Sequence, residues 1–259
     1  PIWRFSVETY NGLFLNKRFV RKMYRKINRS EVSEEKKYKY SGLTFLLYPQ
    51  LVENLTGVPY EQYVQGNFYT PLGAENIMFN PEKHHFPESR IIPTEEDSVY
   101  RKAYVKGWVH DENASLLGGV SGNAGLFATA EDLAKLIQMY MNMGVYNNKR
   151  YISEATLKEF TRVQYPENDN RRGLGFDKPY LNNAEKALPD SYPNPEVSAS
   201  SFGHSGFTGT FVWADPEHEL VFVFLSNRVY PTRTHTAIYD LNVRPRLMHV
   251  FYQELQLTK

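Results

Sequence analysis

The sequence predicts an α+β fold in which helices pack on an antiparallel sheet. Near the C-terminal end, the apolar runs 211–214 and 220–226 flank the polar stretch 215–219, which contains Pro216. Two such runs joined by a short turn are typical of an antiparallel hairpin. Apolar side chains at helical spacing in residues 129–144 and 244–255 predict helices that cover this sheet.

Further helices are predicted earlier in the chain. Residues 16–28 place apolar side chains on one helical face. Residues 43–56 predict a helix that ends at Gly57 and is kinked or split at Pro49, because proline removes an internal hydrogen bond. Residues 59–69 predict another helix, and Ser153 caps a short one that runs to about residue 161.

The remaining segments are predicted to be loops, with one exception. Residues 81–93 hold three prolines, and residues 165–201 are rich in Pro, Asn, Asp and Ser. Within the second loop we expect one strand near residues 173–176. In the C-terminal helix, we expect the sheet to be covered by Leu247, Val250, Phe251 and Leu255.

Composition excludes several classes of function. The chain has 259 residues, 41% hydrophobic side chains and a net charge of +1, which indicates a real core and no general attraction to nucleic acid or membranes. No cysteine is present, so thiol catalysis and thiolate metal sites are excluded. His84 and His85 are adjacent and do not share a face, so we expect neither a metal nor another cofactor.

The helix at 16–28 leaves an alternative open. Its polar face consists of lysines and arginines, as expected of a helix that binds acidic lipid or nucleic acid. Three glutamates, Glu31, Glu34 and Glu35, follow at once. We therefore favour an ordinary surface helix packed on its own domain.

The stretch Gly203-His204-Ser205-Gly206-Phe207-Thr208 leads into the hairpin and is the most informative part of the chain. Glycines allow a backbone to approach another molecule closely, and the edge of a sheet can present N–H groups to it. Two further segments stand out in the order of the chain. They are Tyr40-Ser41-Gly42, followed by the helix at 43–56, and residues 109–133, which contain Ser121-Gly122-Asn123-Ala124-Gly125.

Taken in this order, the three segments resemble the motifs of the serine β-lactamase and penicillin-binding protein superfamily, in the branch of class C β-lactamases, D-aminopeptidases and esterases. The resemblance extends from about residue 40 to the end. It implies a β-lactamase/transpeptidase-like fold, with a mainly helical part at about 40–165 and a sheet part at about 170–259. The implied chemistry is attack of a serine on an ester, amide or peptide bond and formation of an acyl-enzyme.

The resemblance also implies roles for particular residues. Tyr40 matches the family tyrosine that relays a proton, and His204 stands where the family has lysine or histidine. Phe207 would donate its backbone N–H to the oxyanion hole. Four more positions, Gly42, Ser205, Gly206 and Thr208, would contact the substrate.

The residue at position 204 affects the expected substrate, and two other positions depart from the family pattern. An unperturbed histidine has a pKa of about 6.5 and is mostly neutral at pH 7. His204 should thus attract a substrate carboxylate less than lysine would, which favours esters or amides without an obligatory carboxylate. Gly42 stands where the family often has asparagine, and Asn123 where relatives often have histidine.

The family nucleophile is the serine of a Ser-x-x-Lys motif, normally several dozen residues before the tyrosine. The one string that fits, Ser33-Glu34-Glu35-Lys36, lies in a charged run close to Tyr40 and is better interpreted as a solvated loop. We therefore expect residues 1–259 to be the C-terminal part of one serine hydrolase domain. The nucleophile helix and the N-terminal strands would be missing.

Several expectations follow for partners and location. The upstream part of the same protein should complete the site, and this chain alone should be inactive. A sheet edge left exposed could support a homo-oligomer. The family's usual substrates imply a peptidoglycan-related or small-molecule substrate and a periplasmic or extracellular location. The alternative is a non-catalytic accessory domain fused to a bacterial glycoside hydrolase that acts on cell-wall sugars.

Overall fold

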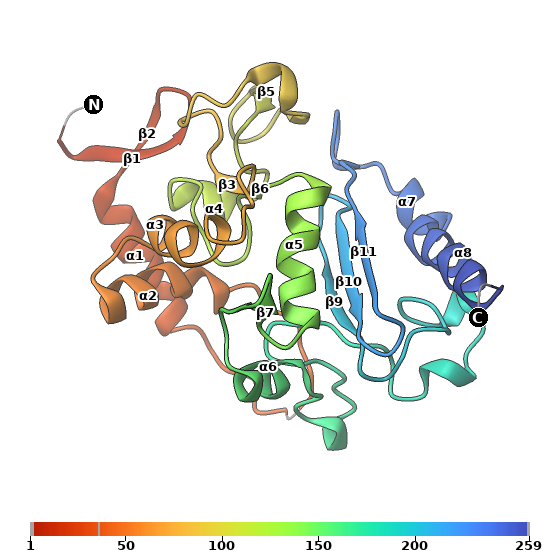
Figure 1. Cartoon of the computed structure of the whole chain (residues 1–259). Helices are drawn as coiled ribbons and strands as arrows, with labels where there is room; N and C mark the ends of the chain where they lie inside the picture. The colour runs from red at the N-terminus through yellow and green to blue at the C-terminus, as the bar shows by residue number, and fades with distance from the viewer. Residues whose placement is uncertain (1–2, 36, 258–259) are drawn as a thin grey trace. The chain divides into compact units, whose positions relative to one another are not determined.

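The structure is a computed structural model that describes residues 3–35 and 37–257. The chain divides into two compact units (Figure 1). The first comprises residues 1–129 and 229–233, and the second comprises residues 130–228 and 234–259.

The first unit begins with a hairpin that leads directly into a helix (Figure 1). Strands β1 (Phe5–Tyr10) and β2 (Leu13–Asn16) pair antiparallel, and α1 (Lys17–Asn28) follows at once. The side chain of Asn16 caps α1 by accepting the N–H of Arg18 at 3.0 Å, which confirms the predicted helix.

The hairpin itself was not predicted, although the sequence carries its signal. Asn11-Gly12 separates two runs with apolar residues, and Gly12 adopts φ 72. Asn-Gly favours tight hairpin turns because both central residues tolerate positive φ.

Proline splits the helical segment after Tyr40, as predicted. A short 3₁₀ turn (Phe45–Leu47) precedes α2 (Tyr48–Thr56), and Pro49 lies in the first turn of α2. A proline is tolerated there because the first N–H groups of a helix have no partner within it. Gly57 ends α2 in the left-handed conformation, with φ 73.

The rest of the first unit consists of short elements. The helix predicted at 59–69 forms as α3 (Tyr60–Val64) continued by a π-helical turn (Gln65–Tyr69). The other elements are β3 (Met78–Phe79), which pairs with β6 (Leu126–Phe127), β4 (Pro93–Asp97), which pairs with β5 (Ala103–Lys106), and α4 (Glu112–Leu116). In the predicted loop at 81–93, a 3₁₀ turn spans Glu88–Arg90.

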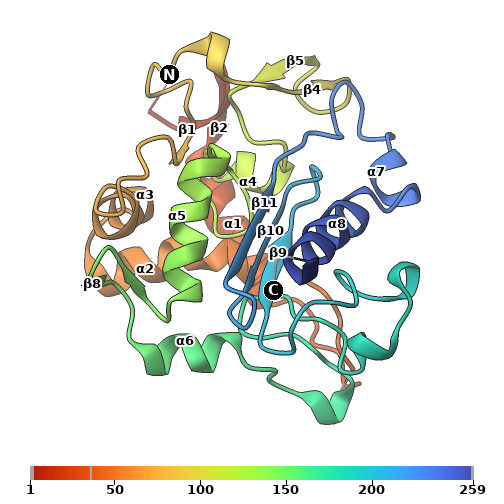
Figure 2. The same cartoon turned by 45° about the vertical axis from the view of Figure 1, so that its right-hand side comes forward.

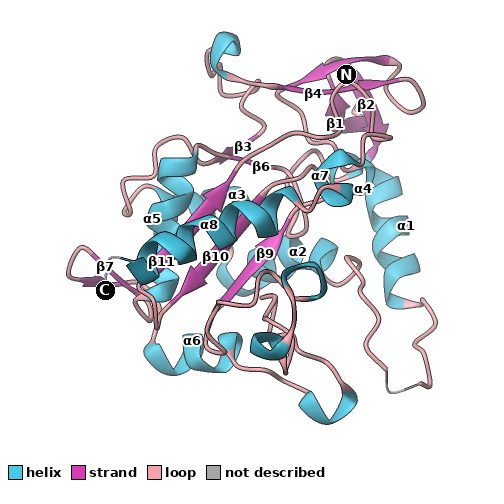
Figure 3. Ribbon diagram, turned by 90° about the vertical axis from the view of Figure 1, so that its right-hand side faces the viewer, coloured by secondary structure: helices cyan, strands magenta, loops and turns pink. Residues whose placement is uncertain are grey.

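The second unit is built on a three-stranded antiparallel sheet, whose strands lie side by side in Figure 3. Its strands are β9 (Phe202–Ser205), β10 (Phe211–Asp215) and β11 (Leu220–Phe224), in the order β11-β10-β9. The predicted hairpin is therefore confirmed as β10 and β11. The other elements are α5 (Ala130–Met141), β7 (Val145–Tyr146), β8 (Lys149–Arg150), α6 (Glu154–Thr161), α7 (Ala237–Asp240) and α8 (Val243–Leu257).

Helices cover both faces of this sheet (Figure 2). Because side chains alternate along a strand, Phe211 and Trp213 of β10 pack with Met248 and Tyr252 of α8. The intervening Ala214 packs on the opposite face with Ile137 of α5 and with Phe202 of β9. Burying each large apolar side chain stabilises the fold by about 1.5–3 kcal/mol, so these two layers form the core of the second unit.

Two predictions about this unit are wrong in detail. Residues 173–176 form no strand, and the chain on either side makes isolated bridges, one between Tyr165 and Asn170 and one between Asp177 and Gly203. The C-terminal helix forms, but Met248 and Tyr252 are the fully buried ones among its described side chains, whereas Leu247 and Val250 are about half exposed. Phe251 is also half exposed, although its ring contacts Phe222 of β11 with centroids 5.6 Å apart, as predicted. The apolar residues of α8 are spread around the helix, so the sequence did not indicate which side faces the sheet.

A buried carboxylate joins the loop at 177–201 and α8 to the sheet. Asp215, at the end of β10, is fully buried and accepts hydrogen bonds from the N–H and hydroxyl of Ser198 and from the hydroxyl of Tyr252. Burial alone would raise the pKa of Asp215, but the hydrogen bonds from Ser198 and Tyr252 lower it overall.

Within the described part of the chain, no helix combines the length and the apolar character that crossing a bilayer requires.

Candidate active site

Five of the seven predicted site residues are consecutive in the second unit. His204 and Ser205 end β9, and Gly206, Phe207 and Thr208 form the turn that leads into β10. Tyr40 and Gly42 belong to the first unit. The roles that the resemblance implies for these seven residues remain predictions.

The hydrogen bonds of His204 define its tautomer. Its Nδ1 lies 2.8 Å from the carbonyl oxygen of Ser205, which can only accept, so Nδ1 carries the proton. Its Nε2 lies 2.8 Å from the guanidinium of Arg172, which can only donate, so Nε2 accepts. Burial lowers the pKa of His204, and the nearby charge of Arg172 lowers it further. The imidazole is thus held neutral.

Arg172 is oriented by a buried acidic residue. Asp177 is 4% exposed and lies 3.4 Å from the guanidinium of Arg172. The guanidinium of Arg171 donates to the same carboxylate and to the carbonyl of Lys178, and it lies over the rings of Tyr180 and Tyr192 at 5.0 and 4.3 Å from their centroids. The backbone of Asp177 also pairs with Gly203 of β9, which places this group beside His204.

Two arginines share this carboxylate. The guanidinium groups of Arg171 and Arg172 both face Asp177 beside the strand that carries His204. We expected the histidine to leave this position without a cation. The expectation that His204 is neutral agrees with its lowered pKa. That expectation did not take Arg172 into account. The cation at this position is a guanidinium that lies next to the histidine.

The turn after His204 is firmly held. The N–H of Gly206 donates to the carbonyl of Thr210 at 2.8 Å. The carbonyl of Phe207 accepts from Arg228 Nε at 2.8 Å and from the hydroxyl of Tyr239 at 3.2 Å, and the guanidinium of Arg228 also lies over the Phe207 ring. The ring of Phe207 is 58% exposed. A backbone fixed in this way suits a preorganised hydrogen-bond donor.

In the first unit, the two departures from the family pattern are neighbours. A Cβ built on Gly42 would lie 4.0 Å from Nδ2 of Asn123. The Oδ1 of Asn123 accepts the hydroxyl hydrogen bond of Ser121 at 2.6 Å, which orients the amide. Next to it, a Cβ on Gly122 would lie 2.4 Å from the carbonyl oxygen of Phe45. The amide of Asn123 therefore lies next to the space that a larger residue at position 42 would fill.

The string Ser33-Glu34-Glu35-Lys36 is described only in part, because Lys36 lies outside the described residues. Residues 33–35 belong to no helix, and the hydroxyl of Ser33 accepts the N–H of Glu35 at 3.2 Å. This arrangement fits the interpretation as a solvated loop.

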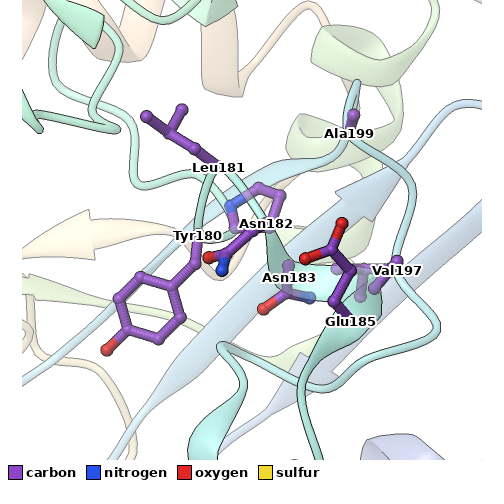
Figure 4. Close-up of a pocket in the computed structure, with 9 residues that line it drawn as sticks. Tyr180, Leu181, Asn182, Asn183, Glu185, Val197 and Ala199 are labelled. Carbon is purple, nitrogen blue, oxygen red and sulfur yellow. The ribbon is translucent and has the colours of Figure 1, made fainter. Parts of the chain in front are cut away.

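A shallow pocket opens in the loop that carries these arginines (Figure 4). Residues 179–185 line it together with Val197 and Ala199, and Glu185 is the carboxylate among them. Tyr180 lines the pocket and also contacts Arg171. The loop thus combines a concave surface with the residues that orient Arg172.

No group of three or more His, Asp or Glu side chains that could hold a metal occurs among the described residues. Of the paired histidines, His84 contacts Glu61 at 3.0 Å.

Arg172 and Asp177 were missed as candidate site residues. The sequence shows them only as Arg171-Arg172 followed by Asp177 in a loop. Paired arginines near an aspartate are common on surfaces. Only the contact with His204, which is 32 residues away in sequence, distinguishes this pair.

Comparisons with known proteins agree with the motifs. The Beta-lactamase family model matches residues 7–243. A curated relative, a candidate D-alanyl-D-alanine carboxypeptidase of Salmonella gallinarum, is 32% identical over 228 residues, which are 84% of this chain and 50% of the relative. The chain therefore spans about half the length of the curated relatives it matches.

Solved structures show the same fold at low identity. A β-lactamase from Mycobacterium bovis matches with a TM-score of 0.54 and 19% identity, over 85% of this chain and 65% of that one. Simvastatin synthase from Aspergillus terreus matches with a TM-score of 0.58 and 15% identity, over 85% of this chain and 56% of that one. The mixed α+β architecture is thus that of β-lactamase folds over most of the chain.

Proposed function

This chain belongs to the β-lactamase family of serine hydrolases, and from that premise we propose that it binds a peptide with a free C-terminal carboxylate for cleavage through an acyl-enzyme. The substrate would be a peptidoglycan-type peptide that ends in D-Ala-D-Ala. The similarity to candidate D-alanyl-D-alanine carboxypeptidases supports this substrate class.

The observation that carries the proposal is the cation beside His204. Arg172 lies 2.8 Å from Nε2 of this histidine, and both arginines of the pair contact Asp177. A guanidinium binds carboxylates through charge-assisted hydrogen bonds, which are stronger than neutral ones. This charge favours a substrate that ends in a carboxylate over a neutral ester.

The residues would act in sequence on the scissile bond. A serine attacks the carbonyl carbon, and the backbone N–H of Phe207 stabilises the negative charge that develops on the carbonyl oxygen. Tyr40 relays the serine proton to the leaving nitrogen, which departs as free D-alanine. Water then attacks the ester carbonyl of the acyl-enzyme and regenerates the serine.

The serine and its lysine are the parts that these residues do not supply. The only Ser-x-x-Lys string in the chain is Ser33-Glu34-Glu35-Lys36, and its serine lies in a non-helical segment. We therefore propose that a segment beyond these residues completes the site and that the chain alone is inactive. A peptidoglycan substrate would place the protein in the periplasm or outside the cell, which fractionation after osmotic shock would test.

The test compares two peptides that differ only at the C-terminus. Release of D-alanine from an acyl-D-Ala-D-Ala peptide, and of D-alaninamide from its C-terminal amide, would be measured with the natural gene product. We expect the acid to be the better substrate and Arg172→Gln to raise its KM by roughly 10- to 100-fold, because a charge-assisted hydrogen bond is worth about 1.5–3 kcal/mol. The amide should be little affected. Arg162→Gln, an exposed change of equal charge at the residue that follows α6, is the control.

Three outcomes would contradict parts of the proposal. Equal losses on both peptides would mean that Arg172 only positions His204. Turnover of p-nitrophenyl acetate by the 259-residue chain alone would contradict its inactivity. A gene product that releases no D-alanine and takes no fluorophosphonate label would instead favour the non-catalytic accessory domain.

A further inference from the structure

Helix α1 presents a wide surface that is entirely cationic. Lysines and arginines recur in pairs every four residues, a spacing that gathers them on one side of a helix. All are exposed, and none makes an ion pair with an acidic residue among the contacts found in the described chain. They are Lys17, Arg18, Arg21, Lys22, Arg25 and Lys26.

The net charge of the whole chain does not reveal this concentration of positive charge on α1. The chain has a net charge of +1, yet α1 contains no acidic residue, so the rest of the chain is net negative. The glutamates that follow the helix were expected to offset the basic face. The structure instead pairs Glu35 with Lys37, at 3.9 Å, outside the helix.

The opposite side of α1 accounts for its folding and leaves the cationic side available. Val20, Met23, Tyr24 and Ile27 are half-buried in the first unit. Burial is the main cause that raises the pKa of the Tyr24 phenol. The apolar stripe thus anchors the helix.

Exposed apolar side chains border the cationic surface. Trp3 is 65% exposed, and its ring lies 5.2 Å from Nζ of Lys17. Phe19, in the first turn of α1, is 40% exposed, and Leu13 of the adjoining hairpin is 44% exposed. Tryptophan and other large apolar residues beside lysine and arginine are the composition of surfaces that lie on lipid headgroups.

We propose that α1 and the adjoining end of the hairpin bind an anionic lipid bilayer. The cations would contact the lipid phosphates while Trp3 and Phe19 enter the headgroup layer. Duplex nucleic acid would use the same cations but would offer no apolar layer to these two side chains, so lipid is the better match. This inference is independent of the proposed hydrolase activity, and either can fail without the other.

The experiment is sedimentation of the chain with vesicles. Vesicles of phosphatidylglycerol and phosphatidylcholine in equal parts should bind it at 0.1 M NaCl, and pure phosphatidylcholine should not. Because each cation near an anionic surface strengthens binding about fivefold, the variant Arg18→Gln/Arg21→Gln/Arg25→Gln should partition about 100-fold more weakly. Raising NaCl to 0.5 M should also release the protein.

A matched variant separates the position of the charges from their number. Lys149→Gln/Lys158→Gln/Arg246→Gln removes the same net charge from exposed sites elsewhere, and it should bind as the unmodified chain does. Equal losses in the two triple variants would overturn the proposal, as would a failure to bind the anionic vesicles.

Tryptophan fluorescence provides a second readout. Trp108 and Trp213 are 4% and 0% exposed, so a blue shift of the emission on adding vesicles would report on Trp3. We expect this shift with anionic vesicles and its loss in Trp3→Ser. Binding to duplex DNA as tight as binding to vesicles, without the shift, would show a general polyanion surface and refute the lipid proposal.

Discussion

Replacing Tyr252 with phenylalanine removes a single hydroxyl from the interior of the second unit. The side chain is fully buried, and its hydroxyl donates to Oδ2 of Asp215 at 2.6 Å. Burial raises the pKa of this phenol, and the Asp215 carboxylate raises it further, so the hydroxyl stays protonated and donates. The ring itself, packed on Trp213 and Phe222, is retained in the variant.

The expected loss follows from this geometry. A hydrogen bond to a charged group contributes about 1.5–3 kcal/mol, and Asp215 keeps its two bonds from Ser198. We therefore expect Tyr252→Phe to lower the free energy of unfolding by about 2 kcal/mol. Asp215→Ala leaves buried donors on both Ser198 and Tyr252 without an acceptor. Since each of these three donors costs about 1–3 kcal/mol, the total loss should exceed about 3 kcal/mol.

The assay is urea unfolding of the single and double variants, followed by circular dichroism. In the Asp215→Ala background, Tyr252→Phe should cost less than about 0.5 kcal/mol, because the acceptor is already gone. Ser200→Ala, an exposed neighbour that donates to Glu217, is the control and should change stability by less than about 0.5 kcal/mol. A full loss for Tyr252→Phe in both backgrounds would show that the hydroxyl acts through packing and that the hydrogen bond contributes nothing.

Three further substitutions and a fall in pH should change the stability of the fold. Gly203→Ala should cost at least about 3 kcal/mol, because the new Cβ would lie 2.1 Å from the backbone oxygen of Val212. Gly206→Ala meets only the movable hydroxyl of Thr210 and should cost clearly less, and similar melting temperatures for the two variants would contradict this difference. Ser153→Ala removes the cap of α6, whose hydroxyl accepts the N–H of Thr156 at 3.1 Å, and should cost about 1 kcal/mol in urea unfolding. Acid should destabilise the fold. A group whose pKa is lower in the folded chain than in the unfolded chain stabilises the fold at pH values above its unfolded-state pKa. This stabilisation is lost as the pH falls through its folded-state pKa. The contribution of His204 to the free energy of unfolding should decline below about pH 6.5, and that of Asp215 below about pH 4. Free energies of unfolding that do not change between pH 7 and pH 5 would contradict the part assigned to His204.

The sequence predicted the local setting of His204 but not the arginine beside it. The position of His204 on a strand followed by a glycine turn could be predicted, because the turn depends on neighbouring residues. The neutral state of His204 was also expected from its ordinary pKa. The positive charge beside it was not, since Arg172 and His204 are 32 residues apart in the sequence and meet only in the folded chain.

The sequence by itself determined the elements whose signals are local. Asn16 and Ser153 begin helices, Gly57 ends one, and alternating apolar residues form the β10–β11 hairpin, because caps, turns and side-chain alternation act within a few residues. Tertiary structure alone decided which side of α8 is buried and that Arg172 lies against His204. Both depend on contacts between residues far apart in the chain, where burial and charge are set by whichever segments the fold brings together.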